Sequence, residues 1–418
     1  MAMVDVGVKP PQSVERRVPG TAAARVVGGA PSSDLAQASV QARHYLPGGR
    51  ERGGGIGRLV GYVVDELGDR NIRHEISDTR GPTLTVLGSP FRLFLAGVTL
   101  IRDRLFAPRC IQHIHIAGRG STVRKLMLTG VARLIGSTHV LHLHDPEYAD
   151  DIARRPAPIR FAIKRMFQGA DRVVVLGHRD RRLMEEKLDI APHRVAVLHN
   201  AVPDPKPTMT YARSPSSPFN ILFLGRLSER KGVPELLEAL AHPQMQGVDW
   251  RATLAGDGPI DDYREQASAL GVVDRIDFPG WVDEPAVRAL CARADVLVLP
   301  SHAEGMAMSV LEGMANALTV VTTRVGAHEE VLTEDVNGRF VTPGDPEGLA
   351  EALAVLSRDP AGCERLARAA RVYFLDNLSI AAYADRLQRV YASMEGERRG
   401  SARDAAPLAV DTSDGRPS

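Results

Sequence analysis

The chain has 418 residues, of which 44% are hydrophobic and 25% charged, and its formal net charge is +1. This length predicts two or three domains with sizeable cores, and the near-neutral charge argues against a nucleic-acid-binding protein. Three distant cysteines without a C-x-x-C pair exclude a disulfide framework and indicate a reducing cytoplasm. The stretch Leu93–Ile101 falls short of the roughly 20 residues of a membrane span, and no secretory signal pattern is present.

Residues 1–35 lack periodicity, and we expect a disordered extension there. A strand near 40–46 leads into the glycine-rich segment 47–57, and a helix follows from Leu59. Glycines at a strand-to-helix turn let the backbone approach a ligand closely, although a flexible surface loop is the alternative. The segment lacks the third glycine of a G-x-G-x-x-G fingerprint, which counts against a dehydrogenase.

Alternating strands and helices continue to about residue 198, which predicts a doubly wound domain with a parallel sheet. His142 and His144 close one strand on the same side, at the end where such sheets place their sites. A zinc pair is conceivable, but no third ligand stands at a recognisable spacing. A purely structural role is the other alternative. His113 and His115, on the preceding strand, could line the same face.

Two segments, 119–133 and 160–167, are basic with interleaved apolar residues. Such helices can lie on anionic membrane surfaces, although a solvated face beside a core face explains them equally well. The first domain ends in the proline-rich linker 200–207. We therefore place the first domain at 36–205 and the second at 206–376, followed by a terminal helix at 377–395 and a disordered tail at 396–418.

The second half opens with a strand at 219–224, and the turn that follows carries Arg226 and Lys231 before a helix. Two cations at such a turn can hold a diphosphate and stabilise its departure. Farther on, the apolar run 296–299 predicts a buried strand, Glu304 falls in the next loop, and Glu312 falls in a helix over 306–315. The N-terminus of that helix directs free N–H groups into the crevice at the strand ends.

The pattern E-G-x-x-x-x-x-x-E, from Glu304 to Glu312, resembles the signature of the retaining sugar transferases of glycosyltransferase family 4. The segments G-R-L-S-E-R-K-G at 225–232, G-D-G-P at 256–259 and V-G-A-H-E-E at 325–330 match further motifs of that family. The resemblance implies an α/β protein of GT-B architecture, with two doubly wound Rossmann-like domains facing across a cleft. The first would bind the acceptor, the second the nucleotide-sugar donor, and the terminal helix would return to the first domain.

The resemblance also implies roles for individual residues. Arg226 and Lys231 would clamp the diphosphate, Glu304 would meet the donor sugar, and Glu312 would hold the ribose. His144 would face the sugar at the reaction centre, and we count it with Glu304 and the two cations as catalytic. The remaining donor-binding candidates are Gly54, Gly55, Gly57, Gly305, Met306 and Ala307, the last standing where many members have Gly or Pro.

We therefore expect a metal-independent, retaining transferase that needs no cofactor and moves a hexosyl group from a UDP-sugar or GDP-mannose to a hydroxyl acceptor. Family habit suggests a lipid-linked glycan of exopolysaccharide or lipopolysaccharide synthesis, and contact with the inner membrane surface. Two alternatives are a nucleotide-sugar epimerase on the same fold and a non-catalytic partner subunit. The epimerase needs a base and acids arranged for elimination, and the partner subunit would be expected to have lost the clamp residues.

Overall fold

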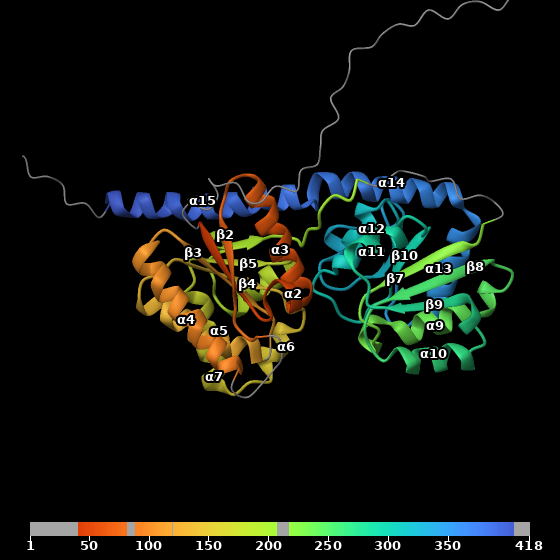
Figure 1. Ribbon diagram of the computed structural model, residues 1–418, viewed down its shortest axis with the longest axis horizontal. Coiled ribbons are helices and arrows are strands. Elements are labelled where there is room, and N and C mark those ends of the chain that lie inside the picture. Colours follow the sequence, from red (N-terminus) through yellow and green to blue (C-terminus); the bar gives the residue numbers. More distant parts are fainter. Residues whose placement is uncertain (1–40, 82–87, 119, 207–216, 405–418) are drawn as a thin grey trace, which may run out of the picture.

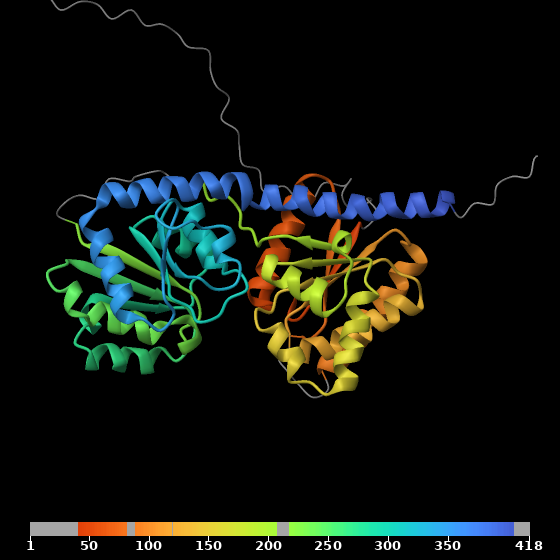
Figure 2. The ribbon, with the colours of Figure 1, turned by 180° about the vertical axis from the view of Figure 1, so that it is seen from behind.

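The computed structural model of the protein describes residues 41–81, 88–118, 120–206 and 217–404, so the whole of the predicted extension and the end of the predicted tail lie outside it. Two α/β domains lie side by side, and the last two helices run along one side of both (Figures 1 and 2). Each domain has one six-stranded sheet in which every strand pair is parallel.

The N-terminal sheet has the strand order β2-β1-β3-β4-β5-β6. Its strands are β1 (Ala42–Leu46), β2 (His74–Asp78), β3 (Ile111–Ile116), β4 (His139–Leu143), β5 (Arg172–Val175) and β6 (Val195–Val197). Its helices are α2 (Gly49–Arg52), α3 (Gly54–Asp69), α4 (Gly88–Phe106), α5 (Gly120–Leu134), α6 (Tyr148–Ala153), α7 (Ala157–Gln168) and α8 (His178–Arg182). Separate apolar clusters on the two sheet faces bury side chains from α4, α5 and α7 and from α3, as a doubly wound fold requires.

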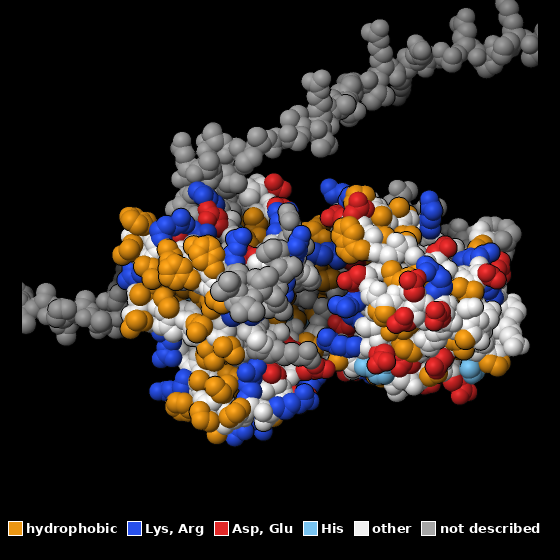
Figure 3. Space-filling model, turned by 60° about the horizontal axis from the view of Figure 1, so that its bottom comes forward, with side chains coloured by type: hydrophobic (Ala, Val, Ile, Leu, Met, Phe, Trp, Pro, Cys, Tyr) orange, Lys and Arg blue, Asp and Glu red, His pale blue; other side chains and the backbone are white. Residues whose placement is uncertain are grey.

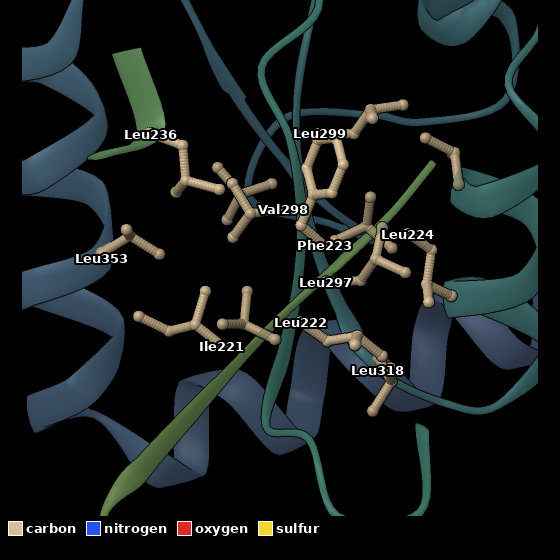
Figure 4. Packing of buried hydrophobic residues seen from close by; sticks show 14 of the residues in the cluster. Ile221, Leu222, Phe223, Leu224, Leu236, Leu297, Val298, Leu299, Leu318 and Leu353 are labelled. Carbon is tan, nitrogen blue, oxygen red and sulfur yellow. The ribbon is translucent and has the colours of Figure 1, made fainter. Parts of the chain in front are cut away.

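The C-terminal sheet has the order β12-β11-β10-β7-β8-β9. Its strands are β7 (Phe219–Leu224), β8 (Trp250–Ala255), β9 (Ile276–Gly280), β10 (Val296–Leu299), β11 (Thr319–Thr323) and β12 (Arg339–Val341). Its helices are α9 (Val233–Ala241), α10 (Ile260–Ala269), α11 (Glu284–Cys291), α12 (Met308–Ala315), α13 (Pro346–Arg358) and α14 (Pro360–Asn377). The four residues of β10 are fully buried, which explains their unbroken apolar run, and they pack beside β7 in the centre of the core (Figure 4).

The terminal helix α15 (Ile380–Asp404) crosses from the second domain to the first (Figure 2). Gln388 and Tyr391 on this helix form hydrogen bonds with Gln41 and His113 of the N-terminal domain. The predicted tail from residue 396 is wrong over its first part, because the helix continues to Asp404. Residues 380–404 contain no proline, which would stop a helix.

The glycine-rich segment is also not the predicted loop, since it forms α2 and the first turns of α3. A Cβ on Gly57 would lie 2.6 Å from the carbonyl oxygen of Gly49, and one on Gly53 would lie 2.4 Å from the same atom. These glycines therefore let α2 pack directly against α3. Their lack of side chains serves helix packing as well as ligand approach.

Candidate active site

A cavity of about 520 Å³ opens between the two domains. Strand ends and helix starts of both domains supply its walls, so the site forms only when the two domains face each other. All of the predicted site residues except Gly54 and Gly57 line it. The sequence thus brings to one place residues that are up to 257 positions apart, namely Gly55, His144, Arg226, Lys231, Glu304, Gly305, Met306, Ala307 and Glu312.

The two predicted clamp cations follow strand β7. Lys231 ends a short helical turn, and its Nζ lies 2.5 Å from Oε1 of Glu304. Gly232 closes that turn with φ 72°, and a Cβ there would lie 2.2 Å from the carbonyl oxygen of Pro300. Arg226 is exposed to the cavity and forms no ion pair with the residues that the structure describes. Its guanidinium is therefore available to an anionic ligand.

The loop that carries Glu304 rests on the turn around Gly326. A Cβ on Gly326, whose φ is 59°, would lie 2.1 Å from the carbonyl oxygen of Glu304 and 2.2 Å from that of Gly305. The amide of Ala327 donates a hydrogen bond to the carbonyl oxygen of Gly305 at 2.8 Å. Only glycine fits this contact, so the V-G-A-H-E-E segment acts as the support of the first glutamate.

Helix α12 begins at Met308 and not at Met306 as predicted, because the backbone of Ala307 is extended, with φ −71° and ψ 126°. The carbonyl oxygen of Met306 accepts a hydrogen bond from Nδ2 of Asn200 at 2.8 Å. The amide of Ala307 lies 3.3 Å from Nε2 of His328, whose pKa is lowered by burial. Because the amide of Ala307 is occupied, the first amide of α12 that can meet a phosphate is that of Met308.

Glu312 is engaged by a residue that the sequence did not reveal. Arg58, on α3 of the first domain, forms an ion pair with Glu312 on α12 of the second. Burial raises the pKa of Glu312, although the arginine beside it acts in the opposite direction. Arg58 also donates a hydrogen bond to the hydroxyl of Tyr62 at 3.2 Å. The predicted ribose-binding carboxylate thus also joins the two domains across the cavity.

His144 follows the end of β4 and belongs to a cluster of six histidines between the sheet and helices α3 and α15. Its ring stacks on that of His142, with the centroids 4.0 Å apart. Burial lowers the pKa of His144 to about 3. The predicted companions His113 and His115 are there, and β1 and β2 add the two that the sequence did not suggest; the six are His44, His74, His113, His115, His142 and His144.

The sequence offered no third metal ligand beside His142 and His144. In the structure, neighbouring strands bring further histidines close to this pair. Two groups of three histidines have ring nitrogens within 4.8 Å of one another. Both groups consist of neutral imidazoles without a carboxylate among them. Because the histidines come from separate strands, this proximity follows from strand register, which the spacing of residues within one strand does not reveal.

Comparison with known proteins agrees with this architecture. Residues 211–373 match the family described as Glycosyl transferases group 1. The chain is 31% identical over 207 residues to a glycogen synthase of Mycobacterium tuberculosis, which covers 49% of this chain and 50% of that protein. The chain thus spans about half the length of this relative.

Two solved structures share the fold. A glycosyltransferase of Rickettsia africae superposes with a TM-score of 0.69 at 17% identity, covering 85% of this chain and 99% of the other. The Anabaena protein HepE, solved in complex with UDP and glucose, superposes with a TM-score of 0.66 at 18% identity, over 85% of this chain and 100% of its own. The chain therefore has the GT-B fold, and its residues 211–373 are similar to the family Glycosyl transferases group 1.

Proposed function

We propose that the protein is a glycosyltransferase that moves a hexosyl group from a nucleotide-diphosphate sugar to a hydroxyl acceptor with retention of configuration. The observation that carries this proposal is the meeting of a free guanidinium, a lysine and two buried glutamates in one interdomain cavity. Such a set offers cations for a leaving diphosphate and carboxylates for sugar hydroxyls.

In the proposed reaction, Arg226 and Lys231 bind the diphosphate while the amides at the start of α12 face its oxygens. Lys231 would exchange part of its contact with Glu304 for the phosphate, which leaves that carboxylate to orient the sugar. The bond from the anomeric carbon to the phosphate oxygen breaks as the bond to the acceptor oxygen forms on the same face. The departing phosphate oxygen takes the acceptor's proton, so the step needs no carboxylate nucleophile.

The donor we propose is a UDP-sugar or GDP-mannose, bound without a metal ion. The partner known for HepE, UDP with glucose, favours a uridine nucleotide. Trp281, which is 74% exposed and lines the cavity, offers an aromatic face to the base of the nucleotide. Its position on the rim of the cavity suits stacking on a ring that remains partly open to solvent.

Calorimetric titration of UDP, GDP and ADP into the protein without metal tests the donor site. We expect one nucleotide to bind and the variant Arg226→Ala plus Lys231→Ala to bind it at least ~100-fold more weakly, because two charge-assisted contacts are lost. The matched control, Arg293→Ala plus Arg358→Ala, removes two exposed arginines of the same domain outside the cavity and should bind normally. A folded protein that binds none of the three would refute the assignment.

Release of the free nucleotide diphosphate separates transfer from the two alternatives. A transferase releases it in proportion to acceptor glycosylated. An epimerase converts the nucleotide sugar without needing an acceptor, and a non-catalytic partner subunit does neither. Polarimetry or NMR of the new glycosidic bond then reports whether the anomeric configuration of the donor is retained.

We also propose that the acceptor is a lipid-linked glycan and that the N-terminal domain docks on an anionic bilayer. The structure describes no helix long and apolar enough to cross a membrane. Helices α4, α5 and α7 instead present a shared apolar face, visible as the orange area of the N-terminal domain in Figure 3. The apolar side chains of these helices that are at least 59% exposed are Phe91, Phe94, Leu105, Phe106, Met127, Leu134 and Phe161.

The charge of these three helices selects the partner. Together they carry nine Lys or Arg residues and a single acidic residue, Asp103, which is buried. Arg43 holds that carboxylate inside the domain with a hydrogen bond from Nη2 to Oδ1 at 3.1 Å. Lys125 is buried and Lys164 pairs with Asp189, but the three helices still carry an excess of cations. An apolar face bordered by such an excess fits the surface of anionic lipids better than another protein of mixed charge.

Co-sedimentation with phosphatidylglycerol-containing vesicles tests this surface, with pure phosphatidylcholine vesicles beside them. We expect binding to the anionic vesicles, weakened about tenfold or more by Phe94→Glu plus Phe106→Glu because charges replace two exposed apolar side chains that would enter the bilayer. The control Val372→Glu alters a side chain that is 60% exposed on α14 of the other domain and should bind as before. Equal binding by both variants would refute membrane docking through this face.

A further inference from the structure

Four of the clustered histidines form a continuous line of hydrogen bonds across the N-terminal sheet. The ring contacts measure 3.0, 3.0 and 2.9 Å between nitrogens, from β2 through β1 and β3 to the end of β4. The first ring also meets Oε1 of Gln41 at 2.9 Å. We call these four rings the imidazole chain, which runs in order through His74, His44, His115 and His144.

Strand register creates this line. Each member of the chain lies opposite the residue that stands two positions before the next member. His74, for instance, pairs with Ala42, two residues before His44. Side chains two residues apart share one face of a sheet, so each ring lies two residues closer to the carboxyl end of its strand than the ring before it. The line therefore ends where the cavity begins.

The orientation of the Gln41 amide sets the direction of every hydrogen bond in the chain. Its carbonyl oxygen can only accept, so Nε2 of His74 carries a proton and Nδ1 of that ring is a lone pair. Each following contact joins Nδ1 of one ring to Nε2 of the next, so the same assignment passes along the line. At the far end, Nε2 of His144 donates to His115, and Nδ1 of His144 is left unprotonated.

Helix α15 anchors the start of the chain. The amides of Gln388 and Gln41 form two hydrogen bonds of 2.9 Å with each other. At the other end, the ring of His144 is partly exposed and lines the cavity. Its Nδ1 has no hydrogen bond with any residue that the structure describes, and it is not sealed from solvent.

We propose that the imidazole chain, anchored at Gln41, holds His144 as the neutral tautomer protonated on Nε2, so that Nδ1 accepts a hydrogen bond from a ligand hydroxyl. The other members of the chain are thus positioning residues for His144. A lone pair at this nitrogen accepts the proton of a sugar hydroxyl and repels a carboxylate, which selects hexoses over uronic acids. The identification of the ligand as a sugar rests on the proposed glycosyl transfer, whereas the tautomer of His144 does not.

Burial supports a chain without charge, since it lowers the pKa of His74 to about 4 and that of His144 to about 3. A bound metal ion is the competing explanation of the cluster. It would require the lone pairs of three rings to converge on one point, whereas the nitrogens of neighbouring rings face each other in pairs at 2.9 to 3.0 Å. The line of hydrogen bonds explains these ring contacts without a metal ion.

Long-range ¹H–¹⁵N correlation NMR of the full chain labelled at histidine measures the tautomers directly. We expect all four rings to be neutral and protonated on Nε2 at pH 7.5. A matched pair of variants then tests the anchor: Gln41→Glu, which can only accept, should leave these tautomers unchanged. Gln41→Lys, which can only donate, should reverse the whole line and protonate Nδ1 of His144.

His142 provides the control, because its ring stacks beside His144 but hydrogen-bonds to His113, outside the imidazole chain. The variant His142→Gln should leave the tautomer of His144 unchanged. The proposal is overturned if wild-type His144 is protonated on Nδ1, if Gln41→Lys does not reverse it, or if the purified protein contains one bound metal ion per chain. The wild-type spectrum decides the matter even if a variant fails to fold.

Activity adds a second readout that does not affect the first. In Gln41→Lys, we expect turnover of a nucleotide uronate, relative to the corresponding nucleotide hexose, to rise about tenfold, the worth of one hydrogen bond. If no nucleotide sugar is turned over by the wild type, the proposed function fails while the NMR result stands. If the tautomers reverse but the preference does not change, the role assigned to Nδ1 is overturned.

Discussion

The buried histidines predict a steep loss of stability in mild acid. An unfolded histidine titrates near ~6.5, whereas burial lowers the pKa of His74 to about 4 and those of His113 and His144 to about 3. Because the native pKa values lie below the unfolded one, the stability that depends on neutral rings is complete above pH ~6.5. It is lost as the pH falls from there toward 3 to 4. At pH 5.5 each ring costs about 1.4 kcal/mol.

The three rings together lower the free energy of unfolding by about 4 kcal/mol between pH 7.5 and 5.5. Asp180 acts in the opposite direction by about 1 kcal/mol, because burial raises its pKa to about 6 and it gains a proton in the native state. The net expected loss is about 3 kcal/mol. The other buried rings of the cluster, whose pKa values are also lowered, add to it.

Urea unfolding followed by circular dichroism at pH 8.5, 7.5 and 5.5 measures this loss. The two alkaline curves should give nearly the same free energy, since unfolded imidazoles are already neutral there, and this comparison controls for other effects of pH. A fall of less than about 1 kcal/mol at pH 5.5 would refute the reasoning, because it would mean that the rings take up protons in the folded protein.

Three substitutions test other contacts. Arg58→Ala should lower the free energy of unfolding by about 2 kcal/mol, because it leaves Glu312 buried without its partner; an unchanged midpoint in urea would contradict this. Gly326→Ala should reduce turnover at least tenfold in a folded protein, because the new Cβ displaces the loop of the first glutamate; normal kinetics would show that the loop adapts. Tyr391→Phe should cost about 1 to 2 kcal/mol by removing the 2.7 Å hydrogen bond to His113, without changing nucleotide affinity in calorimetry.

Much of the fold could be predicted because each element carries its own pattern. The apolar run of β10 and the cation-bearing turn after β7 are local signals, and they placed Arg226, Lys231 and Glu304 in one crevice through a general rule about parallel sheets. The confirmed architecture follows from such rules together with a family resemblance. The individual roles of the site residues remain predictions.

What the sequence could not supply depends on register and on contacts between domains. Arg58 meets Glu312 across 254 positions, and no pattern in the sequence around either residue indicates the other as its partner. His44 and His74 join the cluster only because their strands pair with a particular offset. The glycine-rich segment was misplaced as a loop because glycine signals close backbone approach in helices as well as in turns.

The crossing of α15 makes the N-terminal domain discontinuous in sequence. Its core cluster includes Tyr383, Leu387 and Tyr391, so one wall of that domain is made from residues that follow the entire second domain. A fragment ending near residue 206 would lack these side chains and expose the apolar surface that they cover. A truncation before Ile380 would remove them from the N-terminal domain, although the cut lies after the C-terminal domain. During synthesis, the first half of the chain therefore cannot complete its fold until the last helix has been made.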